Sequence, residues 1–163
     1  MLTRQQETLV QKYLTQFPQG QPFGVKLRDF LDQFNLTYRE LGKATGVPYA
    51  SLSEICDGTR RGTGILNVYK IAKAFHRIPL IMHNKEARTN HYIKDQDPKR
   101  FIQHIARNIK EERERQGQDY QSLAATVDIS DTTIINIERA KTFTTTSLER
   151  ICAGLGIIPV YLM

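Results

Sequence analysis

The sequence predicts an all-α protein built from two tandem copies of one small helical domain, each followed by a short strand. Three observations favour this fold: an internal repeat, amphipathic spacing of apolar residues, and residue types that start and stop helices. A chain of 163 residues suits one ordinary domain or two domains of about 60–80 residues each. The predicted organisation is an N-terminal helix with its connection (1–22), a first domain (23–83), a linker (84–97) and a second domain (98–163).

The internal repeat aligns residues 36–58 with residues 118–140 without a gap, at an offset of 82. The matched positions pair Tyr38 with Tyr120, Leu41 with Leu123, Val47 with Ile129, Leu52 with Ile134 and Ile55 with Ile137. After a loop that differs by two residues the offset becomes 80, which pairs Val68 with Leu148, Ile71 with Ile151 and Pro79 with Pro159. The chain therefore contains a duplicated unit, and we expect each copy to be one small domain.

An apolar stripe with helical spacing marks a helix ahead of each copy and another at the N-terminus. Ahead of the first copy the stripe consists of Phe23, Leu27, Phe30, Leu31 and Phe34. Ahead of the second copy it consists of Phe101, Ile102, Ile105, Ala106 and Ile109. In residues 3–17 it consists of Leu9, Val10, Tyr13, Leu14 and Phe17, and Pro18 is expected to end this helix.

Start and stop residues divide the first copy into short helices. Thr37 and Glu40 have the spacing of a capping box, which opens a helix. Gly46 permits the positive φ of a tight turn after that helix. Pro48 suits the beginning of the next helix, and Gly58 suits the position just after its end.

The second copy has comparable signals with different residues. Asp119 and Ser130 are the candidate N-caps of two short helices. Asp128 stands where the first copy has its turn glycine, and aspartate tolerates the left-handed region better than most residues. Thr146 and Glu149 have the spacing of a further capping box.

A short apolar run follows each copy, in residues 78–82 and 157–163. Both runs are rich in β-branched residues and too short for helices, so we predict strands. A lone strand leaves its backbone groups unpaired, whereas two runs in one chain can pair with each other. We expect a small antiparallel β ribbon that holds the two domains as an intramolecular pseudo-dimer. The alternative is pairing between chains, which would make a homodimer.

Charge and composition restrict the class of protein. The chain holds 23 Lys+Arg against 17 Asp+Glu, a net charge of +6, and residues 1–90 carry that whole excess, with 13 Lys+Arg and 7 Asp+Glu. This basic half is consistent with a polyanionic partner. Cys56, Cys152 and the histidines have no metal-ligand spacing, so we expect no metal and no cofactor. We found no membrane span or signal peptide, so we expect a cytoplasmic protein without a membrane partner.

A short helix, a tight turn and a second short helix make a helix-turn-helix. The motif residues of the first copy are Thr37, Glu40, Leu41, Gly42, Gly46, Val47, Leu52, Ser53, Ile55 and Gly58. Those of the second copy are Leu123, Ala124, Asp128, Ile129, Ser130, Ile134, Ile137, Glu138 and Ala140. With these residues, each copy resembles the lambda-repressor/Cro-like (Xre) family of DNA-binding domains. The resemblance covers most of residues 23–81 and 101–160.

The resemblance implies that the second motif helix of each copy enters the major groove of DNA. The positions that would face bases are Tyr49, Ala50, Ser51 and Glu54 in the first copy, and Asp131, Thr132, Thr133 and Asn136 in the second. The positions that would face the phosphate backbone are Tyr38, Arg39, Lys43, Arg60 and Arg61, then Tyr120, Arg139 and Lys141. For the two tyrosines, a packing role remains an equal alternative.

The sequence thus predicts a sequence-specific transcriptional regulator, in the form of a repressor, whose partner is double-stranded DNA. The alternative is a protein-interaction module, such as an antitoxin or anti-repressor, in which one or both copies bind a protein partner. Glu54 and Asp131 keep this alternative open, because a carboxylate repels nearby phosphate. We expect no enzyme, because the sequence has no Gly-rich phosphate loop, metal quartet or nucleophile elbow.

Overall fold

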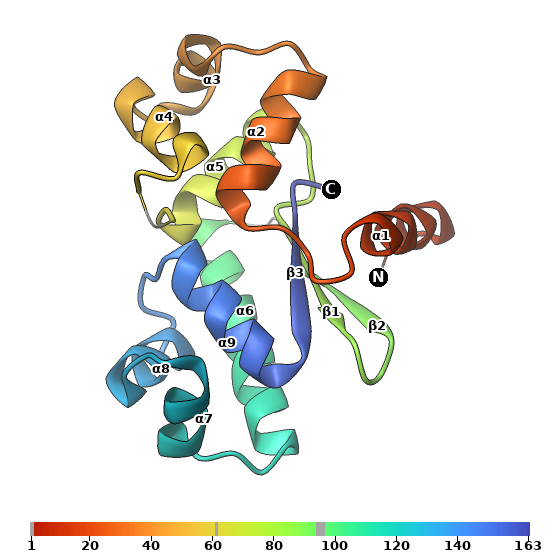
Figure 1. Ribbon diagram of the computed structural model, residues 1–163, viewed down its shortest axis with the longest axis vertical. Helices are drawn as coiled ribbons and strands as arrows, with labels where there is room; N and C mark the ends of the chain where they lie inside the picture. The colour runs from red at the N-terminus through yellow and green to blue at the C-terminus, as the bar shows by residue number, and fades with distance from the viewer. Residues whose placement is uncertain (1, 61, 94–96) are drawn as a thin grey trace.

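The chain is mostly helical in the computed structural model, which describes residues 2–60, 62–93 and 97–163 (Figure 1). The first helix is α1 (Arg4–Gln16). The next four helices, here called the first bundle, are α2 (Phe23–Gln33), α3 (Tyr38–Thr45), α4 (Tyr49–Asp57) and α5 (Ile65–Ala74). The last four, here called the second bundle, are α6 (Pro98–Arg115), α7 (Tyr120–Val127), α8 (Asp131–Glu138) and α9 (Thr145–Leu155).

A small antiparallel sheet lies beside both bundles, with the strand order β2-β1-β3. Its strands are β1 (Leu80–Asn84), β2 (Thr89–Ile93) and β3 (Ile157–Tyr161). β1 pairs with β3 in an antiparallel register that runs from Leu80 opposite Tyr161 to Asn84 opposite Ile157. The predicted antiparallel pairing of the two apolar tails is therefore confirmed, and it joins two parts of the same chain.

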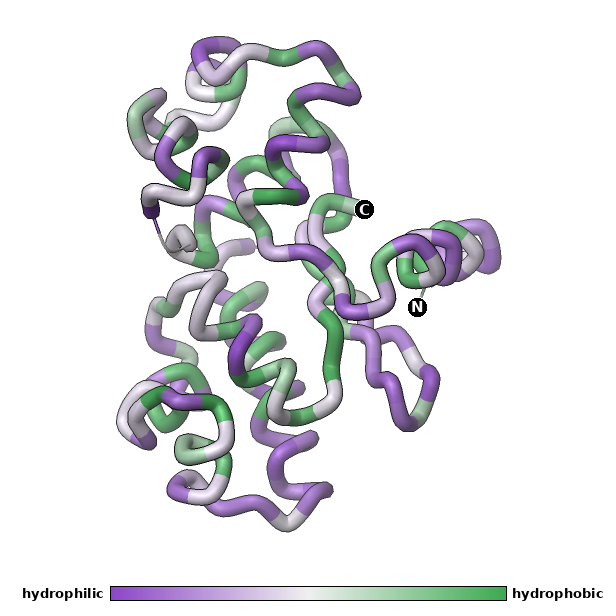
Figure 2. Tube along the Cα trace, viewed as in Figure 1, coloured by the Kyte–Doolittle hydropathy of each residue, from purple (hydrophilic) through white to green (hydrophobic). Residues whose placement is uncertain are grey.

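The sheet is the middle layer between α1 and the two bundles. Successive side chains of a strand point to opposite faces, and in β1 Leu80 and Met82 join the core shared with the bundles, whereas Ile81 points to the other face. That other face is covered by α1, and the packed residues there are Val10, Tyr13 and Leu14 of α1 with Ile81, Ile158 and Val160 of the sheet. Figure 2 shows β3 as a largely hydrophobic segment, in contrast to the hydrophilic turn between β1 and β2. The predicted N-terminal helix therefore exists, and it buries the outer face of the sheet.

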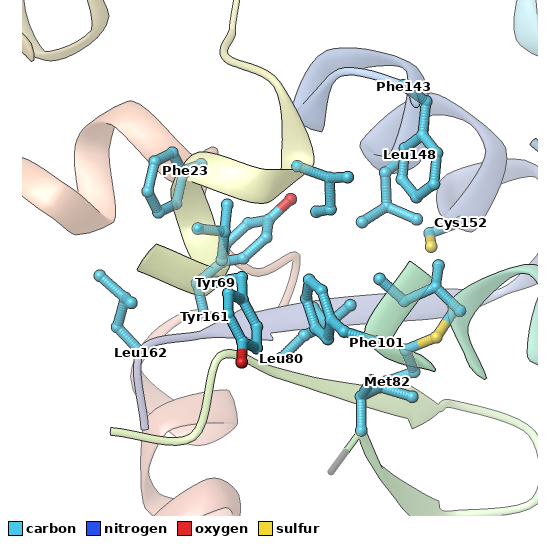
Figure 3. Packing of buried hydrophobic residues seen from close by; sticks show 14 of the residues in the cluster. Phe23, Tyr69, Leu80, Met82, Phe101, Phe143, Leu148, Cys152, Tyr161 and Leu162 are labelled. Atoms are coloured by element: carbon cyan, nitrogen blue, oxygen red, sulfur yellow. The ribbon is translucent and has the colours of Figure 1, made fainter. Parts of the chain in front are cut away.

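The two bundles share one hydrophobic core with the sheet, as Figure 3 shows. Phe23 of α2 packs edge-on against Tyr161 of β3, with ring centroids 5.2 Å apart. Tyr69 of α5 packs against Phe101 of α6, with ring centroids 5.5 Å apart. The first contact joins the first bundle to the sheet, and the second joins the two bundles directly, so apolar burial holds the bundles together and they do not depend on the sheet alone.

A second connection between the bundles is a backbone bridge between Gly64 and Thr144, which precede α5 and α9. The Ile65 N–H donates to the Phe143 carbonyl at 2.9 Å, and the Thr145 N–H donates to the Thr63 carbonyl at 2.8 Å. Thr63 and Ile65 stand 80 positions before Phe143 and Thr145. The repeat offset therefore converts each of these two hydrogen bonds into the other. The pairing of β1 with β3 has the same property, because the offset of 80 converts the pair Leu80–Tyr161 into the pair Ile81–Val160. Both connections therefore have the register of an approximate two-fold contact.

Two local expectations differ from the structure. Part of the segment 84–97, expected as a linker, forms β2, although residues 94–96 lie outside the described residues. Its residues are largely polar, and β2 is held by pairing with β1 and by the Asn90 amide, which donates to the Glu7 carboxylate of α1. The capping box expected at Thr146 and Glu149 is wrong, because the N-cap of α9 is Thr144, whose hydroxyl accepts from the Ser147 N–H at 3.3 Å.

Candidate nucleic-acid interface

The turn between α3 and α4 is built by local interactions that the sequence predicts. The Thr37 hydroxyl accepts from the Glu40 N–H at 3.1 Å, and the Glu40 carboxylate accepts from the Thr37 N–H at 2.8 Å, so the capping box is confirmed. Gly46 ends α3 in the left-handed region, with a φ of 77°. A side chain at Gly42 would place its Cβ 3.0 Å from the Val47 carbonyl oxygen, so a small residue is needed where the chain turns back. These features fix the direction in which α4 leaves the turn.

The side chains expected to face DNA in the first bundle lie on one exposed surface. Tyr49 is 57% exposed, and Ala50, Arg39, Lys43 and Arg60 are exposed as well. Ser51, Glu54 and Tyr38 are half-buried, and the Tyr38 and Tyr49 rings meet edge-on at 5.8 Å. Arg61 lies outside the described residues. α3, α4 and the loop after α4 thus bring the predicted base-facing and phosphate-facing positions together.

The acidic residue on this surface is already paired. An oxygen of the Glu54 carboxylate lies 3.1 Å from the Arg60 guanidinium, and both side chains are about half exposed. Asp57 nearby accepts from the Thr59 N–H at 2.8 Å, and the hydrogen bonds with Thr59 hold the pKa of its carboxyl below the usual value. An exposed pair of this kind is weak, so Arg60 can exchange Glu54 for a phosphate at little cost.

The second bundle forms a similar turn with different residues. Asp119 accepts from the Ser122 N–H at 2.7 Å and so caps α7, and Ser130 accepts from the Thr133 N–H at 3.1 Å and caps α8. Asp128 takes the left-handed conformation between the two helices, with a φ of 55°. Both predicted N-caps and the predicted role of Asp128 in the turn are confirmed.

The predicted contact residues of the second bundle are also solvent-accessible. Thr132, Arg139 and Lys141 are exposed, and Asp131, Thr133 and Asn136 are half-buried. The Asp131 carboxylate accepts from the Thr132 N–H at 2.8 Å, at the N-terminus of α8, where the helix dipole favours a negative charge. Figure 1 shows α4 and α8 on the same side of the molecule, away from the sheet and α1. The two sets of candidate residues therefore belong to one side of the protein.

Like the Tyr38 hydroxyl, which hydrogen-bonds the Cys56 thiol, the Tyr120 hydroxyl is engaged inside the protein. It donates to the Glu138 carboxylate at 2.8 Å, and this hydrogen bond raises the pKa of the phenol. Arg113 of α6 stacks on the Tyr120 ring at 4.2 Å and donates to both oxygens of Glu138, at 2.6 and 3.1 Å. The guanidinium also donates to the Gln118 carbonyl at 2.8 Å. A buried ion pair therefore lies beside the start of α7 and the end of α8.

Sequence reasoning missed Arg113 and the pairing of Glu138 with it. The available signal was spacing, because Arg113 continues the apolar stripe of Ile105 and Ile109 by one further step of four residues. A charged residue at such a position is buried, and a buried charge needs a partner.

Glu149 was also missed as a contact between the bundles: its carboxylate accepts from the Phe23 N–H at 3.2 Å and from the Tyr161 hydroxyl at 2.8 Å. The N-cap residue of α2 is Pro22, whose side chain makes no capping hydrogen bond. Glu149 therefore supplies the hydrogen-bond acceptor at the N-terminus of α2.

The described residues contain no group of three or more His, Cys, Asp or Glu side chains that could hold a metal ion. In the part of the chain that the structure describes, no helix is long and apolar enough to cross a membrane. Cys56 and Cys152 are both free thiols and both buried.

A helix-turn-helix family model matches residues 27–80, which include most of α2, all of α3 to α5 and the first residue of β1. The match therefore coincides with the first bundle, where the geometry of the turn is described above. No curated protein and no solved structure matches the chain.

Proposed function

We propose that this protein is a sequence-specific repressor of transcription that binds double-stranded DNA with two non-identical helix-turn-helix units in one chain. The helix-turn-helix match in residues 27–80 indicates a DNA-binding transcription regulator. The second bundle extends this proposal, because its helix starts, its turn residue and its base-facing positions correspond to those of the first at the repeat offset. Occupying a site is by itself enough to block other proteins there, so repression needs no further activity of the chain.

The proposal of a pseudo-dimer rests on which residues pair in the two connections between the bundles. The Gly64–Thr144 bridge and the β1–β3 pair both join residues that exchange under an offset of 80. Identical subunits form such contacts around a two-fold axis, which also places their recognition helices for two half-sites of one duplex. The shared core would hold α4 and α8 in that relation without a second chain.

The two units would read different sequences. Asn136 can bond both N6 and N7 of adenine, and Thr132 can contact a thymine methyl group. At the corresponding surface of the first bundle, Glu54 can accept from cytosine N4, and Ser51 can bond several bases. Because the two helices differ, the site would be asymmetric, unlike the palindrome that a homodimer reads.

In this proposal five exposed basic side chains would contact phosphates: Arg39, Lys43, Arg60, Arg139 and Lys141. If each replaces one counterion, the logarithm of the binding constant should fall with the logarithm of salt concentration with a slope of about −4 to −5. The acids that favoured a protein partner are partly accounted for, since Glu54 pairs with Arg60 and Asp131 bonds its own helix terminus. These pairings support DNA as the partner over an acidic interaction surface.

The test is selection of binding sites from random duplex DNA with the purified full chain, with light scattering to give the mass of the complex. We expect an asymmetric motif bound by one chain. Asn136→Ala should relax the sequence preference in one half of the motif, and Ser51→Ala should relax it in the other half. Gln5→Ala, at an exposed position of α1, is the control and should change neither half. A palindromic motif bound by two chains would contradict the pseudo-dimer. The absence of any enriched motif at low salt would contradict DNA binding and leave the protein-interaction alternative.

A further inference from the structure

The first bundle has a hollow beside Leu31 and Tyr38, the residues that correspond to Arg113 and Tyr120 of the second bundle. At the offset of 82, Arg113 corresponds to Leu31 and Glu138 corresponds to Cys56. Both replacements are smaller, and burial raises the pKa of the Cys56 thiol to about 11, so this corner holds no buried charge. Tyr38 keeps the position of Tyr120, but no guanidinium stacks on it from α2 as Arg113 does from α6.

The hollow lies between α2 and the N-terminal ends of α3 and α4, with a volume of about 560 Å³. This volume is within the range of small-molecule sites, which is about 300–1,000 Å³. Leu31 and the Tyr38 and Tyr49 side chains line it, and the two rings meet edge-on at 5.8 Å. Tyr49 is 57% exposed, so its ring is accessible for contact with a ligand.

The charged residues that line the hollow determine the sign of the ligand. Arg28 and Arg39 contribute two guanidinium groups, and Asp32 contributes one carboxylate. The local charge is therefore positive, and guanidinium groups bind phosphate or carboxylate oxygens through two parallel hydrogen bonds. The two tyrosine rings suit a flat ring, because stacking on an aromatic side chain is tolerant of the identity of the base.

We propose that this hollow binds a small anion that carries a flat aromatic ring, of which a nucleoside monophosphate is the simplest example. Tyr38, Arg39 and Tyr49 also belong to the surface proposed to contact DNA, so a bound ligand would exclude the duplex. Competition with DNA rests on the proposed function, whereas ligand binding itself does not. The chain would then carry an effector site on one of its two units, since in the second bundle Arg113 occupies the corresponding corner.

The test is calorimetric titration of the full chain, without DNA, with thymidine 5′-monophosphate and guanosine 5′-monophosphate. We expect saturable binding of one molecule per chain below about 1 mM, and binding at least about tenfold weaker for inorganic phosphate or thymidine alone. Tyr49→Ala and Arg39→Gln should each weaken binding about tenfold. Asp131→Ala and Gln121→Ala, the same positions in the second bundle, are the matched controls and should leave it unchanged.

A second variant fills the hollow. Leu31→Arg combined with Cys56→Glu introduces the ion pair of the second bundle and should abolish monophosphate binding. Circular dichroism checks its fold, and the exposed Tyr49→Ala change gives the same information if this double variant does not fold. No saturable binding up to about 10 mM, two molecules per chain, or equal loss in the matched controls would overturn the site.

Displacement of a labelled selected duplex by the monophosphate separates the two proposals. Displacement that is lost in Arg28→Gln, which changes a lining residue outside the proposed DNA-contact set, supports competition at this hollow. Monophosphate binding without displacement overturns competition but retains the site. Duplex binding without any monophosphate binding overturns the site and leaves the proposed function intact.

Discussion

The corner where α6 meets the start of α7 and the end of α8 is packed differently from the corresponding corner of the first bundle. In the second bundle Arg113, Glu138 and Tyr120 form a network of charge-assisted hydrogen bonds, and the Arg113 and Glu138 side chains are only 9% and 3% exposed. In the first bundle the corresponding residues are Leu31, Cys56 and Tyr38, and the two buried side chains carry no charge. A buried ion pair gains attraction but loses hydration, so its net contribution to stability can be close to that of apolar residues. The same helical framework therefore accepts either solution, provided that both partners change together.

The largest effect should come from removing one partner of the ion pair. Glu138→Ala leaves the Arg113 guanidinium buried without its carboxylate and should lower the free energy of unfolding by about 3 kcal/mol. The matched change in the first bundle, Cys56→Ala, removes only a sulfur atom and should cost about 1 kcal/mol. Urea denaturation of both variants measures the difference. Equal losses would contradict the view that the two corners are packed differently.

Replacing both residues of the ion pair together tests the same difference between the two bundles. Arg113→Leu combined with Glu138→Cys installs the residues of the first bundle, and we expect the double variant to lose no more than about 1.5 kcal/mol. Its loss should therefore be smaller than that of Glu138→Ala alone, since no charge is left buried. A double-mutant cycle with the two single variants gives the coupling energy. A double variant less stable than Glu138→Ala would show that the framework of the second bundle requires the ion pair.

The turn residue offers a smaller contrast. Gly46 and Asp128 both have a left-handed backbone, with φ values of 77° and 55°, and the space around a Cβ at Gly46 is empty. Gly46→Ala should therefore cost about 1 kcal/mol through backbone strain alone. Asp128→Gly removes backbone strain from the folded state but raises the conformational entropy of the unfolded chain. It should therefore change the free energy of unfolding by less than about 0.5 kcal/mol. Thermal or urea unfolding checks both, and a large loss for Asp128→Gly would assign its side chain a role beyond the turn.

The smallest effect concerns pH and the contact of Glu149 with the first bundle. Burial raises the pKa of the Glu149 carboxyl, against the opposing hydrogen bonds from Tyr161 and Phe23. Folding thus favours the protonated acid, and this contribution is present below the unfolded pKa and lost as pH rises through the folded pKa. The free energy of unfolding of the wild type should fall relative to Glu149→Gln between about pH 4 and pH 7.

Tyr69→Phe supplies the control, because Tyr69 occupies the corresponding position of α5 at the offset of 80. The difference in stability between this variant and the wild type should not change over the same pH interval, since both proteins retain Glu149. A difference between wild type and Glu149→Gln that stays constant with pH would rule out the raised pKa.

Features that depend on neighbours in sequence could be predicted from the sequence by itself. The helices of the repeat, the capping box at Thr37 and Glu40, the left-handed turn residues and the strand character of the two tails all arise from spacing and residue type within a few positions. The resemblance of the first copy to a helix-turn-helix family rested on the same local pattern, and the family model matches that segment. Local physics determined these elements because a cap or turn is satisfied by groups only two to four residues away.

Only the tertiary structure decided which partners meet across the chain. Glu149 bonds Phe23 across 126 positions, Arg113 finds Glu138 across 25, and the polar β2 becomes a strand only because β1 is beside it. The hollow beside Tyr38 likewise exists because the fold brings Arg28 and Leu31 of α2 beside Tyr49 of α4. Such contacts depend on distances that the folded helices set, and a sequence of residues gives no distance between segments far apart along it.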